Sequence, residues 1–80
     1  MDSQDVRSRV RNVFIRVFPD LKTAEFDFDT AQDSFPGWDS FTHMDLAAAL
    51  EKEFSIRLTT AEIMSPDTAS AWAALIEKKL

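Results

Sequence analysis

The residues able to do chemistry are few, and the most distinctive of them stands at the start of a predicted helix. Ser40 follows an acid, Asp39, and precedes a large apolar residue, Phe41. The chain has one histidine, His43, and no cysteine, so thiol nucleophiles, thiolate zinc sites and disulfides are excluded. A catalytic triad would have to centre on that single imidazole, which has no recognisable partners. The sequence therefore argues against an enzyme, and it predicts that His43 lies on the surface.

Composition excludes further classes of protein. The single glycine rules out glycine-rich loops that bind phosphate. A formal net charge of −5 makes nucleic acid a poor partner and basic proteins better ones. The acidic run that starts at Asp27 fails the EF-hand pattern, because Gln32 and Trp38 stand where Gly and Glu are required. No metal site is predicted.

Length and hydropathy indicate one small domain, residues 1–80. The chain has 80 residues, of which 45% are hydrophobic, an ordinary globular mixture. No stretch approaches the roughly 20 apolar residues of a membrane span, and the polar N-terminus does not resemble a signal peptide. We expect a free-standing, monomeric, cytoplasmic protein that does not insert into membranes.

Four amphipathic segments without a credible sheet predict an all-α fold, a four-helix bundle with three longer helices and a short third one. The predicted helices are residues 3–18, 39 or 40–54, about 59–64, and 69–79. Pro19 and Pro66 are expected to end the first and third helices. Thr59 and Glu62 form a capping-box pattern, and Asp67 or Thr68 is expected to cap the last helix.

The segment between the first two helices, residues 19–38, is long for a loop. Its Phe-Asp-Phe-Asp run alternates like a strand, but no second β-rich segment exists to pair with it. We expect an ordered loop whose aromatic side chains anchor it to the core. These are Phe26, Phe28, Phe35 and Trp38.

The run from Gly37 to Phe54 resembles the acyl carrier proteins. Their signature places Asp-Ser-Leu at the head of the second helix, followed by Leu, Ala-Leu-Glu and a closing Phe. Here Asp39-Ser40-Phe41 fills the signature, and the matching downstream positions are Leu46, Ala49-Leu50-Glu51 and Phe54. The resemblance extends over most of the chain, since the order of helices and the long loop also agree.

This resemblance implies that Ser40 carries 4′-phosphopantetheine, transferred from coenzyme A by a phosphopantetheinyl transferase. Asp39 matches the acid that accompanies the family's serine. The first turn of a helix suits the phosphodiester, because its free N–H groups and positive dipole end face an anion. The terminal thiol of the arm holds acyl groups as thioesters, so the chain needs no cysteine of its own.

The resemblance also makes the second helix the docking face for acyl-transferring or acyl-activating enzymes with basic patches. Asp45 and Glu51 match its acidic positions, and Phe41, Met44 and Ala48 its apolar ones. The opposite side of the helix and its neighbours line either an acyl cavity or a plain core. The residues concerned are Leu46, Ala49, Leu50, Ile63 and Trp72.

Departures from the family pattern favour a specialised carrier over a central fatty-acid carrier. Thr42, His43 and Lys52 make the second helix less acidic than usual, and residues 1–22 carry +2 against −7 for residues 23–80. The sequence is compatible with a carrier of a fatty-acid, polyketide or related pathway. Two alternatives are also open: an unmodified helical interaction module with this fold, and an amino-acid (peptidyl-type) carrier, although the Gly-Gly pattern of the latter is missing.

Overall fold

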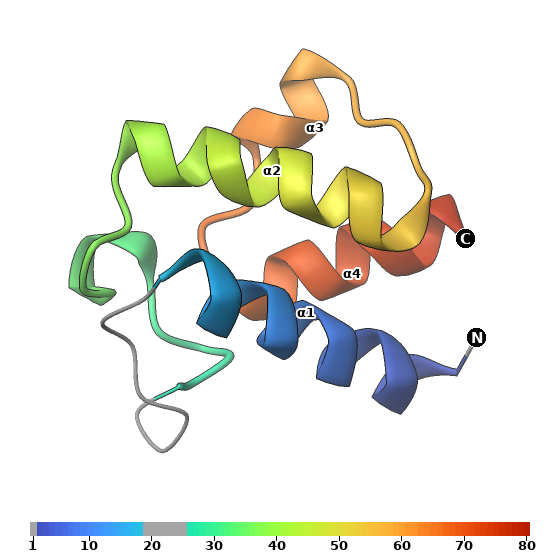
Figure 1. The fold of residues 1–80 in the computed structure, drawn as a ribbon, viewed down its shortest axis with the longest axis horizontal. Helices are drawn as coiled ribbons and strands as arrows, with labels where there is room; N and C mark the ends of the chain where they lie inside the picture. The colour runs from blue at the N-terminus through green and yellow to red at the C-terminus, as the bar shows by residue number, and fades with distance from the viewer. Residues whose placement is uncertain (1, 19–25) are drawn as a thin grey trace.

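The computed structural model describes residues 2–18 and 26–80, and the ordered elements in these ranges are all helical (Figure 1). The longer helices are α1 (Ser3–Val17), α2 (Ser40–Phe54) and α4 (Ala69–Lys79), and the short one is α3 (Thr60–Met64). A single 3-10 turn, η2 (Gln32–Ser34), lies in the loop and was not predicted. The all-α, four-helix prediction is confirmed, although α1 ends one residue early, and Pro19 lies outside the described residues.

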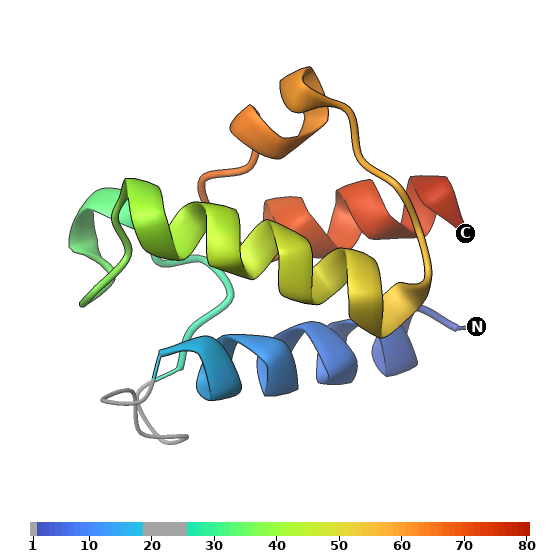
Figure 2. The same ribbon diagram turned by 45° about the horizontal axis from the view of Figure 1, so that its top comes forward.

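The helices form a bundle in which α1 packs against both α2 and α4. In the two views, α3 lies on the side of the bundle away from α1 (Figures 1 and 2). No helix among the described residues has the length and apolarity that a membrane span requires.

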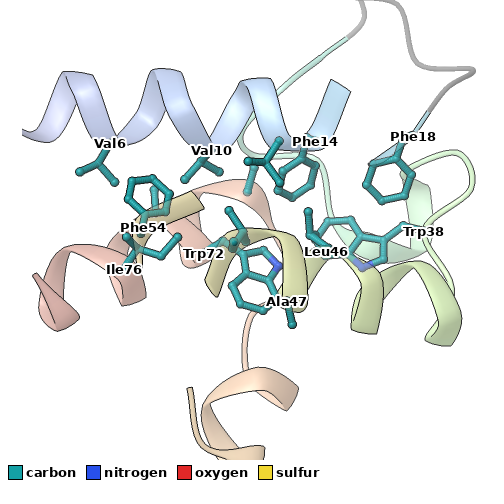
Figure 3. Close-up of a cluster of buried hydrophobic side chains, with 14 of the residues drawn as sticks. Val6, Val10, Phe14, Phe18, Trp38, Leu46, Ala47, Phe54, Trp72 and Ile76 are labelled. Carbon is teal, nitrogen blue, oxygen red and sulfur yellow. The ribbon is translucent and has the colours of Figure 1, made fainter. Parts of the chain in front are cut away.

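The core is built from the predicted apolar stripes of the three longer helices (Figure 3). The fully buried large side chains are Val6, Val10, Val13, Phe14, Leu46, Leu50, Trp72 and Ile76. Ala47 is also buried, whereas Val17 and Ala49 are only half-buried. Leu80 lies one residue beyond the end of α4 and is 53% exposed.

An aromatic cluster ties the long loop to α1. The Phe14 ring lies at the centre, and its centroid is 5.4 Å from Trp38 and 5.6 Å from Phe35 and Phe26. Phe35 and Trp38 are buried and Phe28 is half-buried, so the predicted anchoring of the described part of the loop is confirmed. Edge-to-face packing of this kind stabilises beyond the area it buries. The loop is therefore held firmly just before α2 begins.

The loop is also tied to the start of α4 by its backbone. Gln32 N–H donates to the carbonyl of Asp67 at 2.8 Å, and Ser70 N–H donates to the carbonyl of Phe28 at 3.0 Å. Gly37 then turns the chain with φ of 81°, a conformation that favours glycine, and delivers it to α2. Contacts with α1 and with the start of α4 thus both hold the loop that leads into α2.

Candidate functional site

The N-terminus of α2 is closed by a reciprocal pair of hydrogen bonds. Asp39 Oδ1 accepts from the Thr42 backbone N–H at 3.0 Å, and Thr42 Oγ1 accepts from the Asp39 backbone N–H at 2.7 Å. The Thr42 hydroxyl also donates to the carbonyl of Gly37 at 2.8 Å. Thr42, a departure from the family pattern, is therefore the residue that completes this capping box.

The capping box keeps Asp39 ionised. The backbone N–H of Thr42, with help from the Thr42 side chain, lowers the pKa of Asp39 below its ordinary value of 3.8. Asp39 is exposed, and its carboxylate accepts a hydrogen bond from the first turn of α2. Asp39 thus fixes the backbone at the start of α2, where Ser40 is the first helical residue.

Ser40 is the first residue of α2 and is exposed. The first turn of a 15-residue helix carries the positive end of its dipole, which favours an anion such as a phosphodiester at this hydroxyl. A modifying enzyme can reach the side chain, and two reciprocal hydrogen bonds close the helix start beside it. The residues present therefore fit the attachment of a phosphopantetheine arm.

A small groove of about 170 Å³ adjoins Ser40 and joins three elements. It is lined by Gln32 from η2, by Ser40, His43 and Met44 from α2, and by Met64 from α3. Met64 was not among the predicted site residues. It is 67% exposed, and only its place beside α2 in the folded chain brings it to the site.

His43 is buried rather than on the surface, so that prediction is wrong. Its Nδ1 accepts from the Trp38 indole N–H at 3.0 Å, and its Nε2 lies 2.6 Å from the carbonyl of Ile63. Both bonds form together only in the neutral ring with the proton on Nε2. His43 thus joins the loop before Ser40 to α3. A signal for its burial was available, because His43 precedes Ala47, Leu50 and Phe54 at helical spacing.

Trp38→Phe is expected to lower the free energy of unfolding by about 1–3 kcal/mol, because it leaves a buried ring nitrogen of His43 without its donor. The coupling energy between the two side chains is measured by urea unfolding of Trp38→Phe, of His43→Phe and of the double variant that carries both changes. The double variant should lose less stability than the two single losses added together, since neither ring is then left unpaired. Strictly additive losses would contradict the Trp38–His43 bond.

The predicted docking residues fall into two groups. Phe41 and Met44 are 83% and 51% exposed, and Asp45 and Ala48 are exposed on the same helix. Glu51 differs, because it is half-buried and its Oε2 accepts from the Leu58 backbone N–H at 2.9 Å. That bond gives Glu51 a structural role in the link between α2 and α3, which spacing alone did not reveal.

The predicted lining residues all belong to the core cluster or pack against it. Leu46, Leu50 and Trp72 are fully buried, while Ala49 and Ile63 are half-buried. The structure therefore brings them together on the inner side of α2, opposite the exposed Phe41 and Met44.

Comparison with known proteins identifies the family of the chain. The family model described as a phosphopantetheine attachment site matches residues 8–76, which include α2, α3 and most of α1 and α4. The comparison with curated proteins returned no match. Domains of the matched family are the site of covalent 4′-phosphopantetheine attachment. Since the match covers well over half of the chain, the protein belongs to the phosphopantetheine-attachment family of carrier domains.

Proposed function

We propose that this carrier is a specialised acyl carrier protein and that Ser40 is its attachment residue. One observation carries the proposal: an exposed serine stands at the first position of α2, fixed by the Asp39–Thr42 capping box, in a chain of the phosphopantetheine-attachment family. The arm, when bound, holds acyl groups as thioesters and presents them to partner enzymes. The chain itself supplies the attachment hydroxyl and the surface that those enzymes recognise.

In the modification reaction, the Ser40 hydroxyl forms a phosphodiester. Its Oγ–H bond is replaced by an Oγ–P bond, while the nucleotide half of coenzyme A leaves and a proton is released to the transferase. The positive end of the α2 dipole stabilises the resulting phosphodiester charge. The Asp39 carboxylate accepts from the Thr42 N–H, so the phosphodiester would use the other N–H groups of the first turn.

The test is the intact mass of the unmodified protein after incubation with coenzyme A and a broad-specificity phosphopantetheinyl transferase. The proposal predicts a gain of one phosphopantetheine group per chain. An unmodified interaction module would show no gain under conditions that fully modify a known carrier. A peptidyl-type carrier would gain the same group but would then be charged by an amino-acid-activating enzyme instead of an acyl-transferring one.

We further propose that partners dock on the exposed side of α2 next to Ser40. Phe41 and Met44 offer apolar contact, and Asp45 offers a charge for a basic partner surface. Ala48 lets a partner approach closely, because its side chain is small. Glu51 is the least accessible of the predicted docking residues, since it is half-buried and its Oε2 accepts from the Leu58 backbone N–H.

Asp45→Lys is expected to slow modification by the transferase about 3- to 10-fold at low salt, because a charge that steers a basic partner is reversed. The rate ratio should approach one as salt is raised. Asp5→Lys is the matched control, since it makes the same change of net charge at the first turn of α1, the end of the bundle far from Ser40 (Figure 1). Equal slowing by both variants would contradict docking at Asp45.

A further inference from the structure

One buried polar atom stands out among the described residues. The Trp72 indole is fully buried, and its Nε1 has no hydrogen-bond partner there. The other tryptophan of the chain, Trp38, donates its Nε1–H to His43. A buried donor without an acceptor lowers folding stability, a loss that an apolar side chain of the same shape would not cause. The indole N–H therefore points to an acceptor that the folded chain does not itself supply.

Trp72 does not line the groove at Ser40 but neighbours His43, which does. The centroids of the His43 and Trp72 rings are 5.4 Å apart, and His43 also lines the groove. Figure 3 shows the Trp72 indole extending from α4 in the direction away from α1, which is the side where α3 lies. A chain attached at Ser40 that enters the groove therefore meets His43, whose ring neighbours the Trp72 indole.

The covering element, α3, is weakly held. It has five residues, none of them buried. The bonds that fix it include the His43–Ile63 contact and the ion pair between Lys79 and Glu62, at 2.8 Å. Elements with few buried side chains open at low free energy compared with the global unfolding of a domain. Movement of α3 would break the His43–Ile63 contact and give access to the space between α2 and α4.

We propose that Trp72 determines cargo specificity: its Nε1–H donates to an oxygen borne by the acyl group when that group folds back from Ser40. The inference rests on the proposed carrier function and names the cargo class. The preferred cargo is an acyl group with a keto or hydroxyl oxygen on its carbon chain. A saturated chain leaves the N–H unpaired, so it is held less firmly. Trp72 is here a binding residue and takes no part in bond making.

The experiment compares the carrier loaded with hexanoyl, β-ketohexanoyl and β-hydroxyhexanoyl arms, each transferred from the corresponding coenzyme A derivative and verified by mass. We expect the Trp72 indole N–H resonance in a proton–nitrogen correlation spectrum to move downfield and exchange more slowly with the two oxygenated cargoes only. The Trp38 resonance is the internal control. The melting temperature should exceed that of the hexanoyl form by about 4–8 °C, the shift typical of one hydrogen bond in a domain of this size.

Trp72→Phe should remove the difference between cargoes, whatever it does to the stability of the unloaded protein. Equal Trp72 shifts with hexanoyl and oxygenated cargoes would overturn the inference, since the acceptor would then be the arm. A shifted, protected indole in the unloaded protein would overturn it too, because a buried water would be the acceptor. Where the variant does not fold, the spectra of the natural sequence decide. Absence of loading contradicts the proposed function, whereas complete loading without a Trp72 response contradicts only this inference.

Discussion

Ser40→Ala is expected to abolish the gain of the phosphopantetheine group completely. The substitution removes the exposed hydroxyl at the first position of α2, whereas the Thr42 hydroxyl nearby is engaged in the capping box. It leaves the Asp39–Thr42 capping box in place, because neither bond uses the Ser40 side chain. Circular dichroism and unfolding should therefore match the natural sequence to within about 0.5 kcal/mol.

The matched control for this substitution is Ser34→Ala. Ser34 is also exposed and lies in η2, a few residues before the site. It should retain the full gain of mass at an unchanged rate. A gain that persists in Ser40→Ala but disappears in Ser34→Ala would move the attachment site into the loop.

Phe14→Ala should cause the largest loss of stability, about 3–5 kcal/mol, because it opens a cavity at a fully buried aromatic residue. The Phe14 ring contacts Phe35 and Trp38, which hold the loop in front of Ser40. The loss should therefore be accompanied by slower modification of the fraction that remains folded. Denaturant unfolding and the initial rate of mass gain measure the two effects.

Phe41→Ala makes the same chemical change on the surface and serves as the control. Its side chain is 83% exposed, so the free energy of unfolding should change by no more than about 0.5 kcal/mol. Partner recognition should nevertheless weaken, since Phe41 lies next to Ser40 on the proposed docking face. If both variants destabilised the fold equally, the assignment of Phe14 as the core anchor would be wrong.

The helix limits could be predicted because local chemistry sets them. Thr59 and Glu62 form the predicted capping box before α3, Thr68 caps α4, and Asp39 caps α2. Each of these capping signals spans only three residues, so it can be recognised in the sequence alone. The packing of the loop could be predicted for a different reason, since four large aromatic side chains in one loop favour burial against a core.

The interior of the site could not be predicted, because it depends on where α3 packs. The partner of the buried His43 ring, the Ile63 carbonyl, lies 20 residues further along the chain, so spacing within α2 could not reveal it. The bond from Leu58 N–H to Glu51 likewise forms only after the link between α2 and α3 has folded back. Motif spacing placed Ser40 and Asp39 together, but it carried no information on the groove that Met64 and Gln32 complete.

The most direct test of the central claim is peptide-level mass spectrometry of the protein isolated from its natural host. Tryptic cleavage after Lys22 and Lys52 yields one peptide that contains both Ser34 and Ser40, so fragmentation must assign the modified residue. The carrier function predicts a phosphopantetheine group on Ser40, with or without an acyl thioester. Protein that is abundant in the host yet carries an unmodified Ser40, or carries the group elsewhere, would contradict it.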